Sequence, residues 1–129
     1  MKFLNALPLL LSSISPAAIA VPLADNFSKS CDILGVQQNT LTAICQAPRG
    51  EIRTSLDLNH CFANSDGQIV ARNEGYFHNS CNYCGGTGEG ILRCFCNKKG
   101  SGQEDTKIDM NAVVKNIDGH LTCYGHRGS

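Results

Sequence analysis

Apolar residues occur along the chain in short runs separated by turn residues, and no run has the 3.6-residue spacing of a long amphipathic helix. The runs at 41–45 and 91–96 have the length and the flanking turn residues of β-strands. Because side chains alternate across a strand, Leu92, Cys94 and Cys96 share one face of the second run. The pattern therefore predicts β-structure.

Turn signals mark the ends of these runs. Asp66-Gly67 and Asp118-Gly119 predict hairpin turns, because a type I′ turn needs a positive φ at both central residues. The Asp-x-Asn motifs at 57–59 and 109–111 predict one helical turn each, because Asp and Asn cap helices well. Glycine-rich and polar segments predict loops at 85–90 and 98–105.

The same order of motifs occurs twice. Residues 27–31 recur 50 positions later, the run 41–45 recurs 51 later, and the Asp-x-Asn and Asn-x-Asp-Gly motifs recur 52 later. This slow drift indicates one-residue insertions in loops, so about 27–76 and 77–124 are two copies of one unit. Two copies are too few for a solenoid, and they must bury their apolar faces against each other in one pseudo-symmetric domain.

The first 20 residues have the pattern of a secretory signal peptide. Lys2 precedes an apolar run at 3–11, and small residues lead to an expected cleavage point after Ala20. The run is too short and too interrupted to span a bilayer. We therefore expect a secreted, extracellular protein with one domain over 21–129 and no membrane insertion.

Charge and motifs exclude several functions. Lys plus Arg (11) equals Asp plus Glu (11), which argues against a nucleic-acid partner, because such a protein would show a basic stripe. The Gly-x-Ser-x-Gly, His-Glu-x-x-His and Walker motifs are absent from the sequence. The histidines lack the spacing of a metal site or a catalytic triad; they are His60, His78, His120 and His126. The sequence thus predicts no enzyme, no cofactor and no metal.

Eight cysteines in a short chain with an expected signal peptide predict disulfides, because the secretory route is oxidising. The repeat makes Cys31 and Cys45 equivalent to Cys81 and Cys96, so the simplest hypothesis pairs Cys31 with Cys45 and Cys81 with Cys96. Closing loops of this length contributes on the order of 3 kcal/mol each in the chain-entropy model.

Four cysteines have no counterpart in the other repeat. Cys84 and Cys94 lie inside the 81–96 loop and could form a second disulfide across the same hairpin. The two pairs differ by one residue in strand register, so a bulge or turn would be needed between them. Cys61–Cys123 then follows by elimination. The alternative is a zinc site, although its second ligand pair would be unusually close in sequence; the ligands would be Cys81, Cys84, Cys94 and Cys96.

Polar residues also repeat outside the expected core. Ser30 and Ser80 each precede a cysteine, and Asn-x-Asp-Gly occurs at 64–67 and 116–119. A sugar needs clustered amides, carboxylates and hydroxyls around its own hydroxyl groups, and this doubled polar set suits that need. The simpler interpretation is that Asn-x-Asp-Gly only forms a turn.

The doubled order of motifs resembles the cyanovirin-N homology domain across about residues 26–124. The expected 31–45 and 81–96 pairs match the two disulfides of that family. The resemblance implies an all-β, pseudo-symmetric fold in which each half has a triple-stranded sheet plus a β-hairpin with short helical turns, and in which strands are exchanged between the repeats. It also implies a lectin without enzymatic activity that binds α1-2-linked mannose on high-mannose glycans at two opposite ends.

The resemblance further implies which residues contact the glycan. The first site would comprise Asn26, Lys29, Ser30, Gln46, Pro48, Asn116, Ile117 and Asp118. The second would comprise Asn64, Asp66, Asn79, Ser80, Asn97, Lys98 and Lys99.

Some side chains differ from the family prototype, and they are Lys29, Gln46, Pro48, Asn79 and Ala63. These differences favour a rival hypothesis, a small secreted interaction protein that keeps the fold without binding sugar. The expected partners of a lectin are oligosaccharides or glycoproteins, and the expected state is a monomer or a domain-swapped dimer. Residues 26–28 also form an N-glycosylation sequon, whose glycan would crowd the first site.

Overall fold

The computed structural model describes residues 26–129, so the predicted signal peptide at 1–20 lies outside the described residues. The described part of the first repeat contains α2 (Phe27–Ser30), β3 (Cys31–Gln37), β4 (Thr40–Ala47), β5 (Gly50–Asp57), η1 (Leu58–His60), β6 (Phe62–Ser65) and β7 (Gln68–Ala71). The rest contains η2 (Phe77–Asn79), β8 (Cys81–Gly86), β9 (Ile91–Asn97), β10 (Gln103–Asp109), η3 (Met110–Ala112), β11 (Lys115–Ile117), β12 (His120–Cys123) and β13 (His126–Arg127). Across residues 26–129, no helix has the length and apolar character that crossing a bilayer requires.

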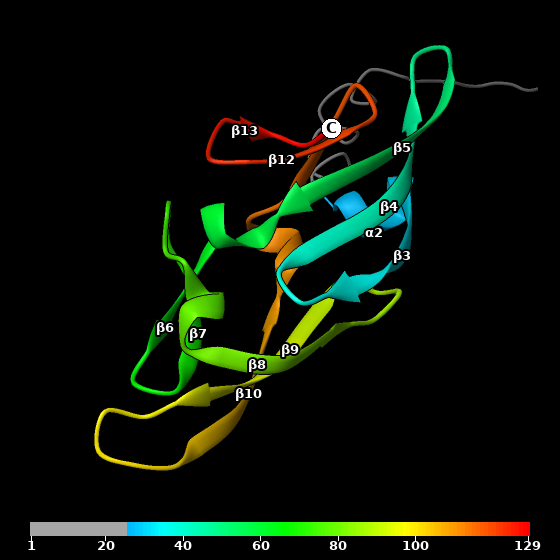
Figure 1. The fold of residues 1–129 in the computed structure, drawn as a ribbon. Coiled ribbons are helices and arrows are strands. Elements are labelled where there is room, and N and C mark those ends of the chain that lie inside the picture. The colour runs from blue at the N-terminus through cyan, green and yellow to red at the C-terminus, as the bar shows by residue number, and fades with distance from the viewer. Residues whose placement is uncertain (1–25) are drawn as a thin grey trace, which may run out of the picture.

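Each repeat forms a three-stranded antiparallel sheet and a hairpin (Figure 1). The sheets have the orders β3-β4-β5 and β10-β9-β8, and the hairpins are β6-β7 and β11-β12, the second extended by β13. This arrangement confirms the predicted all-β, two-repeat architecture. The buried face of β9 carries Leu92, Cys94 and Cys96, which are the residues that the alternation placed together.

The hairpins are exchanged between the repeats. The β6-β7 hairpin lies against β10 of the second sheet, and β12 lies against β5 of the first (Figure 1). Backbone N–H groups of the hairpins donate to buried threonine hydroxyls: Ile69 to Thr106 Oγ1 at 3.2 Å, and Leu121 to Thr54 Oγ1 at 3.2 Å. Thr54 and Thr106 are buried and occupy the same place in the two repeats, so each sheet accepts the partner hairpin by the same contact.

One core joins the two repeats. Phe27, Phe62 and Phe77 are fully buried, and they come from α2, β6 and η2. The rings of Phe62 and Phe77 meet edge to face, with centroids 6.4 Å apart. Because the aromatic side chains of one repeat pack against those of the other, neither half has a separate core.

The predicted turns are confirmed. Asp66 and Gly67 have φ values of 50° and 93°, and Asp118 and Gly119 have values of 53° and 94°, as a type I′ turn requires. The Asp-x-Asn motifs open the 3-10 turns η1 and η3, in which the aspartate side chain accepts a hydrogen bond from the asparagine N–H two residues on, at 2.9 Å in each copy.

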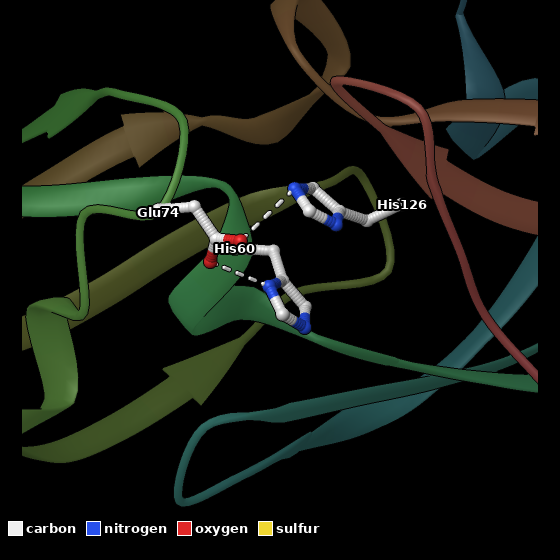
Figure 2. A group of neighbouring side chains, drawn as sticks. All are labelled: His60, Glu74 and His126. Carbon is white, nitrogen blue, oxygen red and sulfur yellow. Dashed lines mark hydrogen bonds and ion pairs between the residues drawn. The ribbon is translucent and has the colours of Figure 1, made fainter.

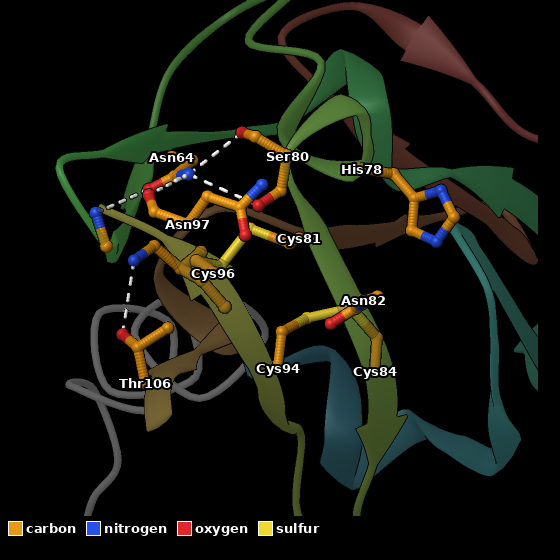
Figure 3. The surroundings of a disulfide bond; sticks show 12 residues. Asn64, His78, Ser80, Cys81, Asn82, Cys84, Cys94, Cys96, Asn97 and Thr106 are labelled. Carbon is orange, nitrogen blue, oxygen red and sulfur yellow. Dashed lines mark hydrogen bonds between the residues drawn. A yellow bond between two sulfur atoms is a disulfide. The ribbon is translucent and has the colours of Figure 1, made fainter. Parts of the chain in front are cut away.

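All eight cysteines are paired in disulfides, in agreement with the sequence argument, and the zinc alternative is wrong. Figure 3 shows the four candidate zinc ligands in two of these disulfides, Cys81–Cys96 and Cys84–Cys94. The pairs are Cys31–Cys45, Cys81–Cys96, Cys84–Cys94 and Cys61–Cys123. The Cys84–Cys94 disulfide between β8 and β9 was expected to require a bulge. The register of the two strands does shift between Asn82 and Gly85, where Tyr83 has a φ of 52°.

The predicted loops are shorter than expected. β8 includes Gly85 and Gly86, and β10 begins at Gln103, inside the segment predicted as a loop. β10 forms although its sequence is polar, because it pairs along its whole length with β9 and because Arg93 Nε donates to Asp105 Oδ1 at 2.8 Å across the sheet. The hydrogen bond from Arg93 lowers the pKa of the Asp105 carboxyl.

We expect Thr54→Val to release the β11-β12 hairpin from the first sheet. The substitution keeps the volume but leaves the buried Leu121 N–H without an acceptor, which costs about 1–3 kcal/mol. Hydrogen exchange at the Leu121 amide should accelerate in this variant, whereas Thr54→Ser, which keeps the hydroxyl, should preserve protection. Equal protection in the wild type and the valine variant would contradict the proposed role of Thr54.

We also expect the two additional disulfides to differ in their effect on stability. Cys61–Cys123 closes a sequence separation of 62, whereas Cys84–Cys94 closes 10 within a loop already closed by Cys81–Cys96. In the chain-entropy model the first contributes about 4 kcal/mol and the nested one much less. Guanidinium denaturation of the variants Cys61→Ala/Cys123→Ala and Cys84→Ala/Cys94→Ala tests this order. A larger loss from the nested pair would contradict it.

Candidate functional site

An asparagine of the second repeat holds together the residues predicted for the first site. Asn116 in β11 donates from Nδ2 to Ser30 Oγ and to the Gln46 carbonyl oxygen, both at 3.0 Å. Its Oδ1 accepts from the Gly119 N–H at 2.8 Å, which fixes the turn that follows. The turn therefore rests against α2 and the end of β4, both of which belong to the first repeat.

The equivalent asparagine of the first repeat does the same at the second site (Figure 3). Asn64 in β6 donates from Nδ2 to Ser80 Oγ at 2.8 Å and to the Asn97 carbonyl oxygen at 2.9 Å. Its Oδ1 accepts from the Gly67 N–H at 2.7 Å. Each candidate site thus combines the hairpin turn of one repeat with the sheet of the other, by the same set of hydrogen bonds.

These bonds use the donor capacity of both asparagines. Each side-chain amide has two N–H groups, and both are engaged within the protein in Asn64 and in Asn116. The structure therefore gives these two residues the role of positioning the turns.

The remaining residues predicted for the first site lie close to this centre. Asn26 precedes α2 and Lys29 lies in it, directly before Ser30; the Lys29 N–H donates to the Asn26 carbonyl oxygen at 3.0 Å. Ile117 is exposed on β11. Gln46 Nε2 donates to Glu51 Oε2 at 3.1 Å, so its side chain is bonded across to the residue opposite it on β5.

A pocket of about 350 Å³ lies beside the Asp118-Gly119 turn. Its lining residues are Ala47, Pro48, Arg49, Gly50, Glu51, Ile52 and Asp118. Ala47 and Ile52 are half-buried, whereas the charged Arg49, Glu51 and Asp118 are exposed. A volume at the lower end of ligand-pocket sizes suits one or two small rings rather than an extended ligand.

Sequence reasoning identified Pro48 and Asp118 in this pocket but missed Arg49, Glu51 and Ile52. They belong to β5 and to the turn before it, a strand whose largely polar sequence has no clear strand pattern. The signal that could have found them is the Pro48-Arg49-Gly50 segment, because proline followed by glycine marks a turn.

The second site has a different charge pattern around the same centre. Asp66 Oδ1 accepts from the Lys99 N–H at 2.8 Å, which ties the hairpin turn to the loop after β9. Lys98 Nζ lies 4.0 Å from Glu104 Oε1, and the Lys98 side chain crosses over Gly67. Asn79 precedes Ser80 and is exposed. Both sites therefore have carboxylates near the turn, and the cations differ: Lys98 and Lys99 lie at the second site, and Arg49 lines the pocket of the first.

The chain matches a known protein family and several solved structures. A protein-family model described as the CVNH domain matches residues 27–122. The solved complex of microvirin with mannobiose is 27% identical, with 76% of this chain and 97% of that chain covered and a TM-score of 0.62. TbCVNH of T. borchii is 25% identical, with 76% and 98% covered and a TM-score of 0.64. A MoCVNH3 variant in complex with (N-GlcNAc)4 is 18% identical, with 76% and 96% covered and a TM-score of 0.70.

We expect Gly119→Ala to disturb the turn beside the pocket. Gly119 has a φ of 94°, and a Cβ there would lie 2.7 Å from the Ala47 Cβ and 2.8 Å from Ile52 Cδ1. Alanine at a positive φ costs about 1 kcal/mol or more before any clash is counted. Thermal unfolding should show a lower Tm for this variant. Gly100→Ala is the matched control, because its Cβ meets no atom within 4 Å and its φ is not positive. An equal Tm for the two variants would contradict the close fit.

Proposed function

Because the chain belongs to the CVNH domain family, we propose that it is a carbohydrate-binding lectin whose ligands are mannose-containing glycans. The observation that carries the proposal is the doubled arrangement of Asn64 and Asn116, each of which fixes a polar turn against the sheet of the other repeat. The mannose assignment is supported by the sequence similarity to microvirin, which binds mannobiose in its solved complex.

The pocket of the first site has the chemistry that a neutral sugar requires. A hexose has hydroxyl groups around its edge and C–H groups on its faces. The half-buried Ala47 and Ile52 and the Pro48 ring offer apolar surface for a sugar face. Asp118, Glu51 and Arg49 offer charged acceptors and donors at the rim, and hydrogen bonds to charged groups are the stronger ones.

We propose the first site as the principal one, with an α1-2-linked mannose disaccharide as its ligand unit. Lys29 of α2, Gln46 of β4 and Ile117 of β11 would contact the sugar, and Asn116 would keep the turn in place. The second site would use Asp66, Asn79, Lys98 and Lys99 around the turn that Asn64 holds. Two working sites would raise the apparent affinity for branched glycans through effective concentration.

The protein is proposed to act outside the cell. Four disulfides are consistent with an oxidising compartment, and the predicted signal peptide would direct the chain there. The proposed action is binding alone, in which no bond of the glycan is broken.

A second candidate function has its own support. A secreted interaction protein could keep this fold without binding sugar. The observation that favours it is that both asparagine side chains donate all of their N–H groups to acceptors inside the protein, although the family resemblance implied that they contact sugar. Glycan binding distinguishes the two functions.

The test is calorimetric titration of the fully oxidised protein with α1-2-linked mannobiose, supported by a glycan array. We expect Asp118→Asn to weaken the first site about tenfold, since it removes a charged acceptor but keeps the Asn-Gly turn. Asp66→Asn is the matched variant at the other end, and it should leave the first site unchanged. Failure to bind any mannose-terminated glycan would refute the mannose assignment. Binding of N-acetylglucosamine oligomers instead would keep the lectin function, whereas no glycan binding at all would favour the interaction protein.

A further inference from the structure

Two histidines and a glutamate from distant segments meet beside η1 (Figure 2). His60 is the last residue of η1, Glu74 lies between β7 and η2, and His126 begins β13. His60 Nδ1 lies 2.8 Å from Glu74 Oε1, and His126 Nε2 lies 3.5 Å from Glu74 Oε2. One ligand atom from each residue falls within 4.8 Å of the others. The histidine spacing in the sequence did not indicate this group, because the fold brings His60 and His126 together from positions 66 residues apart.

We propose that His60, Glu74 and His126 form a binding site for a divalent transition-metal ion, with Zn²⁺ as the ion whose chemistry fits best. Imidazole nitrogen and carboxylate oxygen are both zinc ligands, and two histidines with one carboxylate form a known zinc-binding set. The cysteines do not compete for the ion, because all eight are tied in disulfides.

A fourth ligand is within reach. Asn73 Oδ1 lies 2.9 Å from His126 Nε2, so this amide oxygen borders the same space as the carboxylate. Either Asn73 or a water molecule would complete a four-coordinate site. No residue assigned to the glycan sites takes part.

The backbone holds the ligand residues in place without an ion. The Glu74 N–H donates to the His60 carbonyl oxygen at 3.0 Å, and the Arg72 N–H donates to the Cys61 carbonyl oxygen at 3.0 Å. Glu74 has a φ of 55°, a conformation that residues other than glycine, asparagine and aspartate rarely adopt. This turn places the Glu74 carboxylate against the His60 ring.

His126 is held in place by the disulfide with the largest sequence separation, Cys61–Cys123. Cys61, which follows His60, is bonded to Cys123, and Cys123 lies opposite His126 in the β12-β13 ladder. The disulfide thus fixes the strand that carries His126 next to the turn that carries His60. A bound ion would link the same two segments, the one that carries His60 and the one that carries His126, in addition to the disulfide.

The side chains are accessible and can adjust to an ion. The exposed fractions are 33% for His60, 43% for Glu74 and 29% for His126. The two imidazole rings are stacked, with centroids 4.2 Å apart and planes inclined by 14°. They must tilt apart to bring the ion into the plane of each ring, which partly exposed side chains can do.

The test is calorimetric titration of the oxidised, untagged full domain with ZnCl₂ at neutral pH. We expect one ion per chain, and an affinity at least about tenfold lower in each of His60→Gln, His126→Gln and Glu74→Gln. His78→Gln and His120→Gln are matched controls outside the cluster and should bind as the wild type does. Circular dichroism without zinc checks that each variant is folded.

A second measurement follows the stability of the same proteins. Zinc at about 100-fold excess over its dissociation constant should raise the Tm of the wild type by roughly 10–15 °C, and a chelator should reverse the shift. The double variant His60→Gln/His126→Gln should show no such rise. Absence of zinc binding in the wild type, or binding that persists in the double variant, would overturn the proposal.

Discussion

Neither half of the molecule can complete its own core, and this constraint determines the rest of the structure. Each three-stranded sheet receives the hairpin of the other repeat, and the contact is made by a buried threonine hydroxyl that accepts a backbone N–H. The three buried phenylalanines come from both repeats and pack in one cluster. Folding of one repeat therefore requires the other, so the two units form one cooperative domain.

The exchange also explains where the polar turns lie. Asn64 and Asn116 can reach a serine and a strand end only because each hairpin crosses to the opposite sheet. The fold also places His60 and Glu74 of the first repeat beside His126 of β13, which directly follows the second repeat. The disulfide Cys61–Cys123 ties these segments together and resists their separation.

Local features could be predicted from the sequence, whereas most long-range contacts other than the disulfides could not. The Asp-Gly turns and the Asp-x-Asn caps depend on residues close together in the chain, and both were correctly inferred. The disulfides followed from the repeat and from elimination. β5 and β10 were not recognised, because each is largely polar and turns only a few side chains inward, such as Thr54 and Leu56 in β5. The His60–Glu74–His126 cluster left no signal in the sequence, because its members are brought together only by the exchanged hairpins.

The boundary between the repeats does not coincide with the boundary between the candidate sites. The first site takes its turn from the second repeat and its sheet from the first, and the second site is built in the reverse way. A gene segment that encodes one repeat therefore encodes half of each site. Recombination that replaced one repeat with that of a relative would change both ends of the molecule together, and it would transfer neither binding specificity intact.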